Sequence, residues 1–101
     1  MNYYLGIDIA KTNHVASLIN NTGEVVIRAI KFTNSTEGFH KLLTTIQDKI
    51  GDLSNVESAM EATGQYWLSL YSALTDNGFH VSVYNPYQIK SFRGAYSNRK
   101  Q

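Results

Sequence analysis

The hydrophobic period of the chain first changes near Asn34, and this change constrains the fold more than any other feature. Before it, three short runs rich in apolar and β-branched residues have the pattern of strands, at residues 3–9, 14–20 and 25–32. The stretch Asn-Asn-Thr-Gly at residues 20–23 is typical of a turn, because Asn and Gly tolerate positive φ. The sequence therefore predicts that the chain opens with three antiparallel strands in a meander.

A helical pattern follows the change of period. Apolar side chains recur at helical spacing along one face of residues 39–50. Asn34 or Ser35 precedes them as a candidate N-cap, and Glu37 falls in the first turn, where a carboxylate suits the helix dipole. Gly51 is expected to end this helix.

Strand and helix patterns then alternate to the end of the chain. We expect a strand at 56–62, a helix over 67–77, a strand at 79–84 and a third helix that begins at Asn85-Pro86. The order is β-β-β-α-β-α-β-α. Right-handed crossovers then give a five-stranded mixed sheet in which the fourth strand lies parallel to the first. This is an α/β fold of the ribonuclease H-like type.

Composition limits the classes of protein that the chain can belong to. Its 101 residues suffice for one domain, and 43% hydrophobic with 17% charged residues is a globular rather than a disordered composition. The absence of cysteine excludes a disulfide framework and a thiolate metal site. No signal peptide or membrane span is expected, so we expect a cytoplasmic protein.

The overall charge of +1 hides an asymmetry along the chain. Residues 86–101 carry a charge of +4 with aromatic residues interleaved, whereas residues 1–85 carry −3. Such a tail can contact phosphates and bases, or it can be the solvated face of a helix whose aromatic residues pack on the core. The sequence leaves both interpretations open.

Two carboxylates are the candidate chemical groups. Asp8 lies near the carboxyl end of the first strand, where burial without a partner would be costly, so it is either a satisfied structural acid or a metal ligand. Glu61 lies at the end of the fourth strand, about 4.8 Å away if the two strands are neighbours. Two such carboxylates repel each other unless a cation such as Mg²⁺ or Mn²⁺ lies between them. Glu57 is expected to be a surface acid.

Three separated motifs resemble a known family. They are Leu-Gly-Ile-Asp-Ile-Ala-Lys at residues 5–11, Met-Glu-Ala-Thr-Gly at 60–64 followed by Tyr66 and Leu70, and Asn85-Pro86 followed by Ile89, Lys90 and Phe92. In this order and spacing they are similar to the N-terminal RuvC-like domain of insertion sequence 110 transposases, which are related to Piv-type DNA invertases. The resemblance runs from about Tyr4 to Gln101.

The resemblance implies a metal site and a chemistry. In that family an Asp-Glu-Asp-Asp tetrad binds divalent metal for DNA strand cleavage and joining, and the match places its first two members on Asp8 and Glu61. The last two, two aspartates shortly after the Asn-Pro helix, have no counterpart here, because no acid follows Asp76. We therefore expect residues 1–101 to be a single RuvC-like domain, an N-terminal fragment that is inactive alone. Mg²⁺ or Mn²⁺ is the implied cofactor.

DNA is the implied partner, with an element-encoded RNA and an oligomeric recombination complex as further expectations and no membrane. Lys11 and Thr12, at the tip of the first hairpin, either reach a phosphate or form a solvated turn. The full set of candidate nucleic-acid-binding residues is Lys11, Thr12, Lys90, Arg93, Arg99 and Lys100.

Two rival functions remain at this point. Sugar kinases and actin-like ATPases also begin with a Gly-x-Asp strand, but Ala10-Lys11-Thr12 replaces the glycines with which they cradle phosphate. A non-enzymatic nucleic-acid-binding module would use Asp8 and Glu61 only as structural acids. The histidines show no metal-ligand spacing. His40 is expected on a helix surface, and His14 and His80 within strands.

Overall fold

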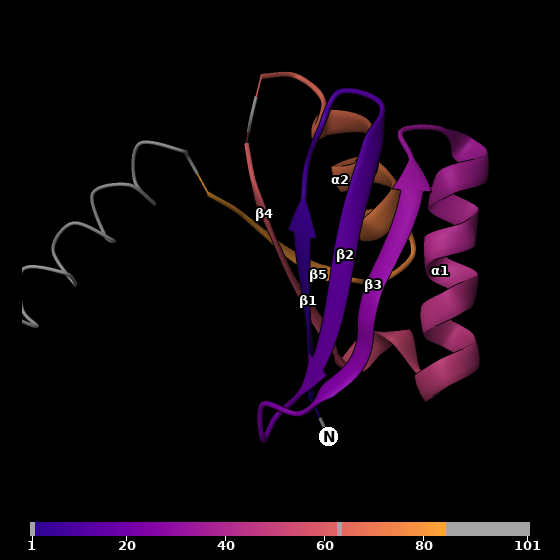
Figure 1. The fold of residues 1–101 in the computed structure, drawn as a ribbon, viewed down its shortest axis with the longest axis vertical. Helices are drawn as coiled ribbons and strands as arrows, with labels where there is room; N and C mark the ends of the chain where they lie inside the picture. The colour runs from indigo at the N-terminus through magenta and orange to yellow at the C-terminus, as the bar shows by residue number, and fades with distance from the viewer. Residues whose placement is uncertain (1, 63, 85–101) are drawn as a thin grey trace, which may run out of the picture.

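A five-stranded mixed sheet forms the centre of the molecule (Figure 1). The structure is a computed structural model that describes residues 2–62 and 64–84. The elements are β1 (Tyr3–Asp8), β2 (Asn13–Asn20), β3 (Val25–Thr33), α1 (Thr36–Ile50), the 3₁₀ turn η1 (Leu53–Asn55), β4 (Val56–Glu61), α2 (Leu68–Asp76) and β5 (His80–Tyr84). Each predicted strand is present, and its ends agree with the prediction to within a residue. The predicted third helix lies outside the described residues.

The strands lie in the order β3-β2-β1-β4-β5. β2 pairs antiparallel with both β1 and β3, whereas β4 pairs parallel with both β1 and β5. The parallel pairs follow from the two helical crossovers, since a strand that returns through a helix runs in the same direction as its neighbour. The predicted ribonuclease H-like topology is confirmed over these elements.

One face of the sheet forms the core with both helices. Alternate strand residues point to this face, and Figure 1 shows α1 beside β3 and α2 behind the middle of the sheet. The buried residues that meet there include Leu5, Ile7, Ala16, Leu18, Val56 and Met60 of the strands, Phe39, Leu42 and Ile46 of α1, and Leu70 and Leu74 of α2. Within the described residues, neither helix is long and apolar enough to cross a membrane.

The opposite side of the sheet, which we call the open face, is covered by neither described helix. The side chains that alternate with the core residues point to it, namely Tyr4, Gly6 and Asp8 of β1, Val15, Ser17 and Ile19 of β2, Glu57, Ala59 and Glu61 of β4, and His80, Ser82 and Tyr84 of β5. Tyr4 and Tyr84 are 41% and 46% exposed. Among the described residues, the open face thus carries exposed polar, acidic and aromatic side chains.

Helix α1 begins against the end of β3 in a tight arrangement. Ser35 is the N-cap, and its hydroxyl accepts a 3.0 Å hydrogen bond from the N–H of Gly38. Gly38 lies so close to β3 that a Cβ on it would clash with the carbonyl oxygen of Thr33. At the other end, Gly51 caps the helix with φ +83°, a conformation that favours glycine. Of the two candidate N-caps, Asn34 and Ser35, the structure has Ser35, and the predicted stop at Gly51 is confirmed.

Candidate metal centre

Asp8 and Glu61 are the last residues of two neighbouring parallel strands, β1 and β4. The register pairs Ile7 with Met60, so the next residue on each strand lies beside the other at the carboxyl ends of the strands. Their backbones are one strand spacing apart, about 4.8 Å. The structure thus brings together the two carboxylates that the sequence analysis selected.

Both carboxylates point to the open face, because the residues before them, Ile7 and Met60, are buried in the core. Asp8 is exposed and Glu61 is half-buried. The desolvation cost considered for an aspartate inside a strand therefore does not arise for Asp8. The two side chains line a hollow of about 770 Å³, whose other lining residues include Val15, Ser17, Ala59 and Tyr84.

Specific contacts hold the loop that follows β1. The N–H of Ala10 donates a 3.1 Å hydrogen bond to Nδ1 of His14, and the N–H of Asn34 donates a 2.9 Å hydrogen bond to the carbonyl oxygen of Thr12. His14 is fully buried and packs edge-to-face on Phe32, with 5.3 Å between ring centroids. His14 is therefore a structural residue that fixes the backbone beside the carboxylates.

Lys11 and Thr12 are exposed in this same loop, at the end of the sheet where the carboxylates lie. The Oγ1 of Thr12 accepts a 3.2 Å hydrogen bond from Nδ2 of Asn13. A role for both residues in phosphate binding stays a prediction. The other candidate nucleic-acid-binding residues, Lys90, Arg93, Arg99 and Lys100, lie outside the described residues.

The residue types at this site fit a hard divalent cation, because carboxylate oxygens are the ligands that Mg²⁺ and Mn²⁺ prefer. The described part of the chain contains no cluster of three or more His, Cys, Asp or Glu residues that could hold a metal ion. Asp8 and Glu61 therefore form a pair rather than a complete ligand set. His40 and His80 are exposed on α1 and β5, as expected, and Glu57 is exposed on β4.

Two other carboxylates have shifted pKa values, and both lie at the opposite end of the sheet. Hydrogen bonds from the side chains of Asn20 and then Thr22 lower the pKa of Glu24. The hydroxyl and then the backbone N–H of Ser54 lower the pKa of Asp52, which caps the 3₁₀ turn before β4. These carboxylates stabilise turns and do not belong to the candidate site.

Tyr84 lies at the site, although it is not among the residues predicted from the sequence. Tyr84 pairs with Glu61 in the register of β4 and β5, and its ring is exposed beside the carboxylates. Its position alternates with Val81 and Val83, which pack against the core. Strand parity combined with the predicted parallel order would have placed Tyr84 on the face that carries Asp8.

Two curated relatives match most of the chain. The pilin gene-inverting proteins of Moraxella bovis and Moraxella lacunata are each 36% identical to it over 90 residues. The match covers 88% of this chain but only 27% of each relative, so the chain spans little more than a quarter of their length.

Solved structures with low sequence identity share the fold. RuvC of Thermus thermophilus in complex with a Holliday junction substrate superposes with a TM-score of 0.56 at 12% identity, over 90% of this chain and 69% of RuvC. A second structure of Thermus thermophilus RuvC gives a TM-score of 0.53 at 15% identity, over 87% of this chain and 66% of RuvC. The likeness confirms a RuvC-like, ribonuclease H-like fold.

The family itself is shown by a match that spans nearly the whole sequence. The family model of the IS110-type DEDD transposases, described as "Transposase", matches residues 5–101. The chain therefore belongs to the IS110-type DEDD transposase family.

Proposed function

We propose that this chain supplies the first two carboxylates of a divalent-metal site in a DNA recombinase that cleaves and rejoins DNA strands. One observation carries the proposal. Asp8 and Glu61 end two adjacent parallel strands, and both point to the open face in a chain of a transposase family. Carboxylates at the ends of adjacent strands repel each other, and a cation between them removes that repulsion.

The residues present suit Mg²⁺ or Mn²⁺, and Asp8 and Glu61 would hold the ion through their carboxylate oxygens. Such an ion, when bound, supplies Lewis-acid stabilisation of charge on a phosphate oxygen during phosphoryl transfer. The register of β1 and β4 places the backbones of the two residues side by side, and the His14 contact holds the adjacent loop. Asp8, at the hollow, is exposed among the described residues, which supports access for a DNA strand.

The pair is half of the tetrad that the family resemblance implies. We propose that residues 1–101 are the N-terminal part of the domain, and that two aspartates beyond Gln101 complete the ligand set in the whole protein. The chain of 101 residues is then expected to cleave no DNA by itself. An element-encoded RNA and an oligomeric recombination complex stay predictions.

Recombination of a DNA substrate by the whole protein tests this proposal. Asp8→Asn and Glu61→Gln should each abolish the recombined product while the circular dichroism spectrum stays unchanged. Glu57→Gln is the matched control, because Glu57 lies on the same strand and the same face as Glu61 but away from the hollow around Asp8. Recombination at the wild-type level by a folded Asp8→Asn protein would favour the non-enzymatic module instead.

A further inference from the structure

A row of five side chains crosses the open face at the level of the carboxylates. Lys31 of β3 pairs with Val15 of β2, Val15 pairs with Asp8, Asp8 lies beside Glu61, and Glu61 pairs with Tyr84 of β5. Paired residues on neighbouring strands point to the same face of a sheet. The row therefore runs across the sheet, from a lysine at one edge to a tyrosine at the other.

Lys31 belongs to the open face by its neighbours as well as by its pairing. Ile30 and Phe32 on either side of it are buried in the core, and Lys31 itself is exposed. Lys41 of α1 donates a 2.8 Å hydrogen bond to the carbonyl oxygen of Lys31. This contact involves the backbone of Lys31 and not its side chain. Lys31 lies two strand spacings, about 10 Å, from Asp8 along the row.

Two kinds of side chain in the row, basic and aromatic, match the chemistry of a nucleic-acid strand. Single strands are bound by basic side chains that contact phosphates and by aromatic rings on which bases stack. Lys31 supplies a cation at one end, Tyr84 supplies an exposed ring at the other, and the carboxylate pair lies between them.

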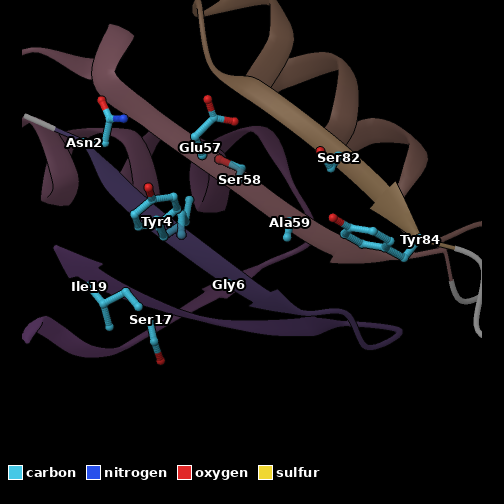
Figure 2. Close-up of a pocket in the computed structure, with 11 residues that line it drawn as sticks. Asn2, Tyr4, Gly6, Ser17, Ile19, Glu57, Ser58, Ala59, Ser82 and Tyr84 are labelled. Atoms are coloured by element: carbon cyan, nitrogen blue, oxygen red, sulfur yellow. The ribbon is translucent and has the colours of Figure 1, made fainter. Parts of the chain in front are cut away.

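The surface next to Tyr84 has room for an unpaired base. A second hollow, of about 580 Å³, adjoins the carboxylate hollow and shares Gly6, Ser17, Ala59 and Tyr84 with it. Figure 2 shows Tyr4 and Tyr84 toward opposite ends of this second hollow, with Gly6 and Ala59 between them. A Cβ added to Gly6 would meet no atom within 4 Å, so there is free space above Gly6 in this hollow.

We propose that a single DNA strand crosses the open face along this row, with one phosphate at Lys31, the reacting phosphate at Asp8 and Glu61, and a base stacked on Tyr84. The inference rests on the proposed function, because the two carboxylates repel phosphate unless a divalent cation is bound. Binding along the row therefore requires a divalent cation. Lys31 and Tyr84 contribute to affinity in that state.

Fluorescence anisotropy of a labelled single-stranded oligonucleotide, with Ca²⁺ as the divalent cation, tests the path. Lys31→Ala should lower the slope of log affinity against log salt by about 0.7, the value for one phosphate contact to a single strand. Tyr84→Ala should weaken binding about tenfold, whereas Tyr84→Phe, which keeps the ring, should not. Lys49→Ala is the control, since Lys49 is exposed in the last turn of α1, on the other side of the sheet.

A blocking variant tests the same path without removing a contact. Gly6→Val adds a β-branched side chain to a strand position with open space around its Cβ, so the fold should keep its stability. The added side chain should nevertheless weaken binding of the oligonucleotide, because it fills the space above residue 6 in the hollow that Tyr84 also lines. A duplex that binds with the same dependence on Tyr84 would overturn the single-strand assignment, because paired bases cannot stack on the ring.

The result that overturns the path differs from the one that overturns the metal site. If Lys31→Ala, Tyr84→Ala and Gly6→Val all bind as Lys49→Ala does, while Asp8→Asn removes the dependence on Ca²⁺, the path is wrong and the metal site stands. If Ca²⁺ strengthens binding equally in wild type, Asp8→Asn and Glu61→Gln, the proposed function itself fails.

Discussion

The contact between Gly38 and β3 leads to a quantitative stability prediction. Gly38 lies in the first turn of α1, and a Cβ there would clash with the carbonyl oxygen of Thr33, a backbone atom that cannot rotate away. Overpacking of this kind costs about 1–3 kcal/mol. Alanine is favoured over glycine inside a helix by about 1 kcal/mol, which offsets part of that cost. Because the clashing atom belongs to the backbone, we take the upper end of that range, about 3 kcal/mol, and expect Gly38→Ala to lower the free energy of unfolding by about 2 kcal/mol after the helix gain.

Urea denaturation followed by circular dichroism measures this change. In a domain of this size, a loss of about 1 kcal/mol corresponds to a fall in Tm of about 4–8 °C. Gln47→Ala is the control, because Gln47 is exposed on the same helix and its replacement should change the stability by less than about 0.5 kcal/mol. A Gly38→Ala protein at least as stable as the wild type would refute the tight placement of α1 against β3.

Three further predictions concern stability and nucleotide binding. Leu42→Ala, at a fully buried position of α1, should lower the free energy of unfolding by about 2–5 kcal/mol, measured by urea denaturation. Leu68→Ala should lower it far less, because Leu68 is 51% exposed. Equal losses in the two variants would contradict the burial of Leu42 in the core. Glu24 and Asp52 have lowered pKa values in the folded state. The stability that they contribute is therefore complete at pH values above their ordinary pKa values of 4.5 and 3.8. It is lost as the pH falls through the lowered pKa values. The double variant Glu24→Gln, Asp52→Asn should therefore lose less stability on acidification than the wild type, and an unchanged pH profile would refute this. ATP with Mg²⁺ should leave the Tm unchanged, whereas a rise would support the kinase-like alternative.

The elements that position the carboxylates could be predicted because their patterns are local. The three strand runs, the cap at Ser35 and the stop at Gly51 are read from short stretches of sequence. The right-handed crossover rule then makes the fourth strand a parallel neighbour of the first. The local patterns and the crossover rule together place Asp8 and Glu61 at the carboxyl ends of neighbouring strands, where the structure has them.

Features that depend on distant contacts were not accessible in the same way. Gly38 reads as an ordinary helix residue until β3 is placed against it, and the complete burial of His14 depends on its packing with Phe32 and its hydrogen bond to Ala10. Tyr84 becomes part of the site only through its register with Glu61. The tetrad assignment of Asp8 and Glu61 came from the family resemblance rather than from their spacing.

Paramagnetic broadening of backbone amide NMR signals by Mn²⁺ tests the central claim most directly, because it locates even a weakly bound ion. In the wild-type chain, the broadening should centre on Asp8 and Glu61 and should extend to Tyr84 on the neighbouring strand. It should disappear in Asp8→Asn and in Glu61→Gln and persist in Glu57→Gln. Broadening that centres elsewhere, or that survives in both Asp8→Asn and Glu61→Gln, would contradict a metal site at the ends of β1 and β4.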